Sequence, residues 1–405
     1  MMRIPLSSPD VGERELDYVT RVLRSNHLSL GPWLPRFEEA FATYAGRKYA
    51  IAANSGTSAL HMCVQAMGLT SGDAVITTAF SFVASANCLL YEGVVPVFVD
   101  IDSATLNIDP RKIRQFLERE CYRDGHGALV DRNTGAIVRA ILPVHVFGLP
   151  CEMDEIQAIA EDYHLEILED SCEAIGATYR GRKAGTFGKA GVFAFYPNKQ
   201  MTTGEGGMVV TDDPQVADRC RSLRNQGRDN SGQWLNHVML GFNYRLSDVH
   251  CAIGLAQLER IEELLRKREA AAESYTRRLQ DSGLQLPLAI SECTRSWFVY
   301  VVQFQGSQAT AKRSELRELL AARGIASQVY FPAIHRQPYY PQALRRIYGD
   351  LQATENAADT CLALPFSSRI TEAEIDEVCE AVTSAVASAA PKSSNYHVVA
   401  AASPI

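Results

Sequence analysis

The chain has 405 residues, 46% of them apolar, and a formal net charge of −7. This length is ample for a sizeable core and suits two domains, or one large domain with a smaller appendage. The acidic balance has no compensating block of lysine and arginine, which argues against nucleic acid as a partner.

Ten cysteines are scattered along the chain without a CxxC pair or a Cys/His cluster of zinc-site spacing. They are typical of small buried hydrophobes in a reducing compartment, and we expect no metal site. The N-terminus lacks the apolar segment of a signal peptide, and the most apolar region, 75–99, is interrupted by polar residues, glycine and proline. We therefore expect a cytoplasmic protein without a membrane span.

Short apolar runs alternate with helical segments from about residue 48 to 210. Strands are predicted at 49–54, 74–78, 95–101, 136–148 and 165–170, and helices at 56–69, 82–93, 109–120 and 153–164. This alternation implies right-handed crossovers and a mostly parallel sheet with helices on both faces. The predicted fold class is α/β, and loops at the carboxyl ends of the strands are expected to form the binding crevice.

A smaller domain is expected at 251–388, after a large domain at 1–250 whose N-terminal segment can pack on it. Residues 246–283 are predicted to form one long amphipathic helix that enters the small domain, with Ser247 as its cap and Gly283 as its stop. The rest of the small domain is predicted as strands at 296–304 and 327–331 and helices at 312–323 and after Thr371. Residues 389–405 are low in complexity, and we expect them to be disordered.

Two charged residues follow neighbouring predicted strands. Asp170 ends a buried strand, and Lys199 comes after the apolar strand at 191–197. Taken alone, such an acid is most often a solvated strand end, and such a lysine is most often a surface residue. Together they offer a carboxylate that can keep a heterocycle nitrogen protonated and an amine that can form a Schiff base. A pyridoxal phosphate enzyme requires both.

Two further features accompany this pair. In NSGTSAL, the residues from Ser55 to Ser58 stand where backbone N–H groups meet at a helix N-terminus, which is an arrangement that binds phosphate. The same letters also describe an ordinary turn and cap. Phe82 follows the strand at 74–78 and can cover a planar ring, or it can pack in the core.

The chain as a whole resembles one family, the DegT/DnrJ/EryC1/StrS sugar aminotransferases, which are pyridoxal phosphate enzymes of fold type I. The resemblance covers nearly the whole chain except the tail and includes the blocks NSGTSALHM, TTAFSFVASANCLLYEGVVPVFVDID, PVHVFGLPCEMDEI, EDSCEAIGATYRGRKAGTFG, KQMTTGEGGMVVT and GFNYRLSDVHCAIGLAQLERI. It implies a large cofactor-binding domain with a mostly parallel sheet flanked by helices, and a smaller α+β C-terminal domain.

The resemblance also implies roles for individual residues. Lys199 would form the Schiff base with pyridoxal 5'-phosphate and move the proton, and Asp170 would keep the pyridine nitrogen protonated. Phe82 would stack on the ring. The phosphate end would be lined by Gly56, Thr57 and Ser58.

Three more residues are carried over from relatives. Asn243 matches the residue that relatives extend to the phosphate of a neighbouring subunit, which implies a homodimer with shared active sites. His145 ends a strand near the site and can touch substrate, although a satisfied core histidine is at least as good a reading. His335 lies in a second-domain loop that in relatives reaches toward the active site, so it is a second candidate substrate contact.

Two positions depart from the pattern of the relatives. Ala194 stands where many relatives place a phosphate-binding serine. Glu173 stands where glutamine is frequent and is kept as a candidate cofactor contact, although a carboxylate beside the phenolic oxygen of the cofactor would repel it unless it were protonated or reoriented. Relatives that dehydrate a deoxysugar have histidine in place of the lysine, so Lys199 favours transamination.

The sequence therefore predicts a pyridoxal phosphate-dependent aminotransferase that moves an amino group from L-glutamate or L-glutamine to a keto-sugar. The expected acceptor is a nucleotide-linked keto-deoxyhexose. One alternative is a keto-cyclitol, which needs the same chemistry on a ring without a nucleotide. Another is a non-catalytic regulatory protein with this fold, although the presence of both Asp170 and Lys199 argues against it.

Overall fold

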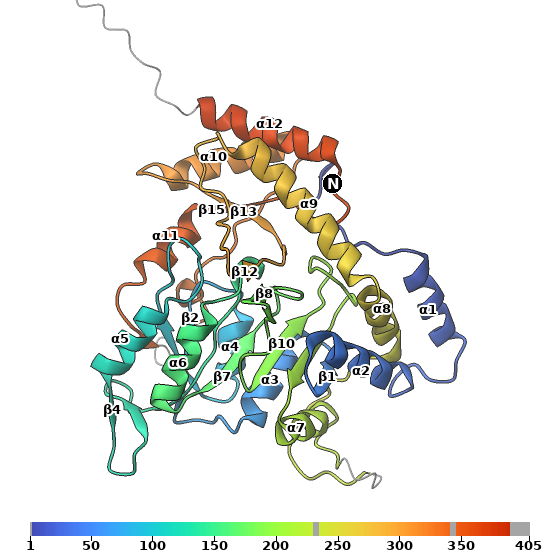
Figure 1. The fold of residues 1–405 in the computed structure, drawn as a ribbon, viewed down its shortest axis with the longest axis vertical. Helices are drawn as coiled ribbons and strands as arrows, with labels where there is room; N and C mark the ends of the chain where they lie inside the picture. Colours follow the sequence, from blue (N-terminus) through green and yellow to red (C-terminus); the bar gives the residue numbers. More distant parts are fainter. Residues whose placement is uncertain (1, 230–234, 341–345, 389–405) are drawn as a thin grey trace, which may run out of the picture.

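A computed structural model describes residues 2–229, 235–340 and 346–388. A large mixed sheet lies at its centre with helices on both faces, and a smaller unit sits at one end, reached through α9 (Figure 1). The predicted disordered tail at 389–405 lies outside the described residues. In the ranges that are described, no helix is long and apolar enough to cross a membrane.

The large unit contains most of the secondary structure. Its helices are α1 (Glu13–Leu23), α2 (Trp33–Ala45), α3 (Gly56–Ala66), α4 (Ala84–Leu90), α5 (Pro110–Glu120), α6 (Met153–Tyr163), α7 (Pro214–Arg224) and α8 (Asp248–Leu258). Its sheet runs in the order β1 (Tyr49–Ala53), β11 (Gly207–Thr211), β10 (Ala190–Ala194), β7 (Glu166–Asp170), β6 (Ile137–Ile141), β2 (Asp73–Thr78), β3 (Val95–Val99) and β14 (Arg346–Ile347).

Along this order the strands are parallel except β11, which is antiparallel to both of its neighbours. The predicted α/β class with a mostly parallel sheet is confirmed. A hairpin of β4 (Cys121–Arg123) and β5 (Leu129–Asp131) attaches to β6. A separate small sheet joins β8 (Thr178–Tyr179), β9 (Arg182–Lys183) and β12 (Cys293–Thr294).

The central strands are apolar on both sides because helices cover both faces of the sheet. Along β1, Ala50 and Ala52 belong to the core shared with α2 and α8. The intervening Ile51 and Ala53 belong to the core shared with α3 and α7. This alternation follows from the two-residue period of a strand, and it makes the sheet a rigid platform for residues at its carboxyl edge.

The single helix predicted over 246–283 is wrong, because the structure has two helices, α8 and α9 (Ile261–Leu279). Ser247 caps α8 as predicted, but α9 ends before Gly283. Arg260 between the two helices has non-helical backbone angles, φ −119° and ψ 17°, and its guanidinium is held by Asp10 and Glu263. Neither glycine nor proline marks this break, so the helical spacing of apolar residues in the sequence predicts one continuous helix across it.

The small unit pairs β13 (Tyr300–Gln303) with β15 (Cys361–Leu364) and packs them against α9, α10 (Ala309–Ala322) and α12 (Glu372–Ser388). A further helix, α11 (Gln352–Thr360), precedes β15. The predicted strand at 327–331 is only a single bridge, between Gln328 and Ala363.

The apolar cores suggest where the two units divide. Ile4 from the N-terminal segment packs in the core of the small unit and bridges to Ile325. Cys251 and Leu255 of α8 pack in the core of the large unit, and Leu264 at the start of α9 does so too. The domain boundary at residue 251 stays a prediction. From these cores, we propose that the boundary between the two units lies within α9.

Candidate active site

Several of the predicted site residues lie at one edge of the central sheet. Asp170 ends β7, and β10 runs parallel beside it with Val192 opposite Asp170. The chain reaches Lys199 soon after β10 ends, and α3 begins just after β1. Because the carboxyl ends of parallel strands share an edge, this topology gathers the side chains that sequence spacing alone could only suggest.

Asp170 is a buried carboxylate, 5% exposed, that is held by neutral donors. Its Oδ2 accepts the hydroxyl of Ser85 at 2.7 Å, and its Oδ1 accepts the N–H of Cys172 at 3.1 Å. In the part of the chain that the structure describes, no cationic side chain pairs with it. A buried carboxylate with spare acceptor capacity suits the protonated nitrogen of a heterocycle.

Lys199 places its amine in a largely buried position, with 12% of the side chain exposed. Its Nζ lies 3.4 Å from Oε1 of Glu173 and 3.7 Å from the ring centre of Phe298. The ring of Phe298 is parallel to that of Tyr330, at an interplanar angle of 10°. The lysine therefore has an aromatic wall and one acidic partner, and it is not a solvated surface residue, which was the alternative that the sequence left open.

Arg268, on α9, fixes the backbone of this lysine. Its guanidinium donates to the carbonyl of Lys199 at 2.7 Å and to that of Phe298 at 3.1 Å. Burial lowers the pKa of the Arg268 guanidinium to about 10. Sequence reasoning missed this residue, because an arginine among the charges of RKREAAAE resembles any solvated helix position.

Glu173 is buried beside the lysine, and its carboxyl is shared between two donors. Oε2 accepts the N–H of Phe147 at 2.9 Å, while Oε1 faces Lys199. Burial raises the pKa of the Glu173 carboxyl, although the nearby Lys199 and the N–H of Phe147 oppose the shift. The side chain predicted with reservation as a cofactor contact is therefore also a partner of Lys199.

The first turn of α3 forms the candidate phosphate end. Ser55 caps the helix by accepting the N–H of Ser58 at 3.0 Å, and the hydroxyl of Ser58 donates to Asn54 at 2.6 Å. The N–H groups of Gly56 and Thr57 have no acceptor among the described residues. Free N–H groups at a helix N-terminus attract anions.

Gly56 is also required by packing. A Cβ at this position would lie 2.7 Å from Cβ of Ala194 and 3.1 Å from Sγ of Cys172. Real Cβ atoms essentially never come that close, so the helix start approaches β10 as only glycine permits. This contact puts Ala194, which departs from the serine of relatives, directly beside the candidate phosphate end.

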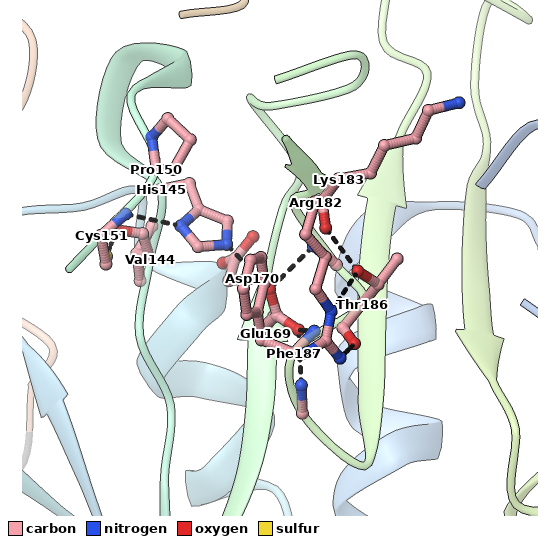
Figure 2. Close-up of polar contacts among 12 residues, drawn as sticks. Val144, His145, Pro150, Cys151, Glu169, Asp170, Arg182, Lys183, Thr186 and Phe187 are labelled. Atoms are coloured by element: carbon pink, nitrogen blue, oxygen red, sulfur yellow. Dashed lines mark hydrogen bonds and ion pairs between the residues drawn. The ribbon is translucent and has the colours of Figure 1, made fainter. Parts of the chain in front are cut away.

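His145 points toward Glu169 in the interior of the protein, and it is fully buried (Figure 2). Its Nδ1 accepts the N–H of Cys151 at 3.1 Å, so Nε2 carries the hydrogen and donates it to Glu169 at 3.1 Å. Both ring nitrogens are occupied, which leaves no atom for a substrate. We therefore correct the suggested substrate contact to the alternative interpretation, a satisfied core histidine.

Of the remaining candidates, two are exposed and one is buried. Phe82 follows β2 with 60% of its surface exposed, and Asn243 is also exposed. His335 is 7% exposed with Nε2 3.0 Å from Glu355, and the N–H of its neighbour Ile334 donates to Ala79 at the end of β2. An exposed aromatic ring at the sheet edge is available to cover a planar ligand, whereas His335 is mostly occupied by its acidic partner.

These residues fit pyridoxal phosphate. Asp170 offers a buried acceptor for a protonated ring nitrogen, and Lys199 offers a buried amine. The cradle at Gly56, which a Cβ would fill, brings unpaired N–H groups to the place where an anion is needed. Ser85 orients Asp170 and was not found from the sequence, since its contact joins α4 to a strand far along the chain.

Comparison with known proteins agrees with this geometry. The DegT/DnrJ/EryC1/StrS aminotransferase family model matches residues 9–383. GDP-perosamine synthase of Caulobacter vibrioides is 38% identical over 94% of this chain and 97% of its own length. The spore coat polysaccharide biosynthesis protein SpsC of Bacillus subtilis is 35% identical over 94% of this chain and 96% of its own.

Solved structures have the same fold. PseC of Helicobacter pylori, described as an aminotransferase involved in the biosynthesis of pseudoaminic acid, superposes with a TM-score of 0.85 at 28% identity. The superposition covers 95% of this chain and 99% of that one. The family model therefore spans the sheet, most of the small unit and the positions of all the candidate site residues.

Proposed function

Because the chain belongs to the DegT/DnrJ/EryC1/StrS aminotransferase family, we propose that it aminates a nucleotide-linked keto-sugar with L-glutamate or L-glutamine as donor. The enzyme is a pyridoxal phosphate-dependent aminotransferase. Support for a nucleotide-linked acceptor comes from the relative named GDP-perosamine synthase. A deoxyhexose remains our proposed sugar.

One observation carries the residue assignment: a buried lysine amine and a buried, cation-free carboxylate lie at the ends of neighbouring strands. Pyridoxal phosphate supplies an aldehyde that can carry an amino group and a ring that withdraws electrons from a bound amine. Lys199 would hold that aldehyde covalently and move the proton at the reacting carbon. Asp170, oriented by Ser85, would hold a proton on the ring nitrogen.

Other residues would bind the cofactor or keep water away from the lysine. The N–H groups of Gly56 and Thr57 would receive the phosphate, with Ser58 supporting the turn through Asn54. Phe82 would cover the ring. The aromatic wall at Phe298 would keep water from the lysine amine.

We further propose a homodimer with shared sites, working in the cytoplasm. Support for the dimer is the exposure of Phe82 and Asn243, which leaves both side chains available to a second subunit. Support for a reducing compartment is that all ten cysteines are free. Equilibrium sedimentation of the holoenzyme measures its mass and so tests the homodimer, and a monomer at working concentration would contradict it.

The assignment of Lys199 is tested by trapping. Borohydride reduction of the holoenzyme should bleach its visible absorbance and attach the cofactor mass to the peptide that contains Lys199. Lys199→Ala should lose the label and the activity, and normal turnover by that variant would refute the assignment. The acceptor is identified by mixing the pyridoxamine-loaded enzyme with keto-sugar nucleotides and keto-cyclitols and recording which one restores the original spectrum.

A further inference from the structure

The carboxyl of Glu173 is satisfied on one side by a fixed donor and on the other by a charge that the reaction removes. The N–H of Phe147 donates to Oε2 at 2.9 Å, and this backbone group keeps its hydrogen throughout. Nζ of Lys199 faces Oε1 at 3.4 Å. Both side chains are largely buried, at 7% exposure for Glu173 and 12% for Lys199, so bulk water is a poor substitute for either partner.

No second cation compensates Glu173 in the ranges that the structure describes, since Lys199 is its one ion-pair partner there. The other ionisable groups that act on it from packed elements are Asp170, Cys172 and Tyr330, none of which is cationic. A buried carboxylate that loses its only cation is strongly disfavoured in ionised form. Covalent linkage of Lys199 removes the ammonium that now pairs with Glu173.

We propose that Glu173 is a proton-holding partner of Lys199, neutral while the lysine nitrogen is linked to the cofactor and ionised when the amine is released. This inference rests on the proposed role of Lys199. On release, the O–H bond of the Glu173 carboxyl breaks and an N–H bond forms on the free amine, which yields a carboxylate–ammonium pair at the 3.4 Å contact of the structure. One proton moves, no electron is exchanged, and linkage reverses the transfer.

The influences on the pKa of the Glu173 carboxyl agree with this exchange. Burial is the largest influence and raises the pKa of the carboxyl, while Lys199 is the main opposing influence. Removing the ammonium therefore leaves burial and the negative charge of Asp170, which both favour the protonated form. The hydrogen bond from Phe147 persists and limits the size of the change.

The test counts protons. Apoprotein is titrated with pyridoxal 5'-phosphate in a calorimeter, in two buffers of different ionisation enthalpy, which gives the protons exchanged with solvent. The net proton uptake of wild type should exceed that of Glu173→Gln by about one, because the proton given up by the lysine nitrogen stays on Glu173 in wild type, whereas an amide cannot hold it and the variant releases it to solvent. Equal counts for these two proteins would overturn the inference.

Glu15→Gln is the matched control. Glu15 is a buried carboxyl, 1% exposed, that accepts from Gly12 and Gln257 and faces Arg260, away from the lysine. Its substitution should leave the proton count of wild type unchanged. A drop in the control equal to that of Glu173→Gln would show that the count reports any buried carboxyl and would overturn the assignment to Glu173.

Two measurements separate this inference from the proposed function. If borohydride labels Lys199 and the proton counts are still equal, the exchange with Glu173 is wrong and the role of Lys199 stands. If Lys199 is not labelled, both are wrong. Should Glu173→Gln fail to fold, infrared difference spectra of wild type still decide, because cofactor loading must add the carbonyl band of a protonated carboxyl, and its absence would overturn the exchange.

Discussion

Replacing Glu169 by glutamine should destabilise the protein more than any other single amide substitution in β7. Glu169 is fully buried next to Asp170, and Figure 2 shows it between His145 and the turn that follows β9. Oε2 accepts Nε2–H of His145 and the N–H of Gly185, and Oε1 accepts the N–H groups of Phe187 and Gly188. All four partners are donors, and none of them can become an acceptor without a structural change.

The expected loss follows from that count of donors. A glutamine keeps one oxygen, which can serve either pair, and its NH₂ group must face the other pair of N–H donors. Each buried donor left without an acceptor costs roughly 1–3 kcal/mol, so two of them predict a loss of about 2–6 kcal/mol in the free energy of unfolding. Relaxation of the turn would place the result near the lower end, since neighbouring effects are not additive.

Urea unfolding of the holoenzyme and amide hydrogen exchange measure this loss together. The urea midpoint reports the change in unfolding free energy if the slope is unchanged. Exchange at residues 185, 187 and 188 should accelerate specifically in Glu169→Gln. Glu166→Gln is the control, since Glu166 lies at the exposed start of the same strand and pairs with Lys189 at 2.9 Å. This surface pair is worth less than about 1 kcal/mol.

The reasoning would be refuted if the two glutamine variants lost the same stability and the turn amides exchanged at the rate of wild type. A loss confined to the Glu169 variant but without faster exchange at the turn would place the effect at His145 instead. His145→Ala in both backgrounds distinguishes these cases. The double-mutant cycle built from Glu169→Gln and His145→Ala should give a coupling energy clearly different from zero if the contact with His145 carries the loss.

Three further predictions concern the cofactor site. Ser85→Ala should lower the free energy of unfolding by about 1–3 kcal/mol, read from the urea midpoint, because Asp170 loses a buried donor; an unchanged midpoint would contradict the contact. Gly56→Ala should cost about 1–3 kcal/mol through overpacking against Ala194 and weaken cofactor binding in an absorbance titration; unaltered affinity would mean that the helix start can yield. Ala194→Ser adds a hydroxyl beside the same turn and should tighten cofactor binding by up to about tenfold, the effect of ~1.4 kcal/mol from one hydrogen bond to an anion; weaker binding would show that no room exists there.

The sequence was sufficient to predict the layers of the fold and the edge where the chemistry lies. Strands that are apolar on both faces and alternate with helices predict a covered parallel sheet, and the carboxyl ends of such strands meet. Asp170 and Lys199 could be found this way because Asp170 ends a recognisable strand and Lys199 comes soon after the next one. The helices between these strands could also be predicted, because helical segments alternate with the apolar strands.

Residues that act through long-range contacts could not be predicted in this way. Ser85 is one of several small residues in a short helix, and only the packing of α4 against β2 and β3 brings its hydroxyl to Asp170. Arg268 has the surroundings of a solvated helix in sequence, yet the direction of α9 buries it against the backbone of Lys199. That direction depends on the break at Arg260, which carries no helix-breaking residue.

The three buried charges around Lys199 are satisfied in different ways, and the difference determines which of them should respond to chemistry at the amine. Arg268 donates its hydrogen bonds to backbone carbonyls that do not change. Asp170 is held by a hydroxyl and an amide, both neutral, so its partners also persist when the lysine reacts. Glu173 alone among these depends on the ammonium for half of its contacts. A proton that follows the state of Lys199 should therefore reside on Glu173. Substitution of Ser85 should leave the proton count at the wild-type value, although it removes a hydrogen bond to Asp170.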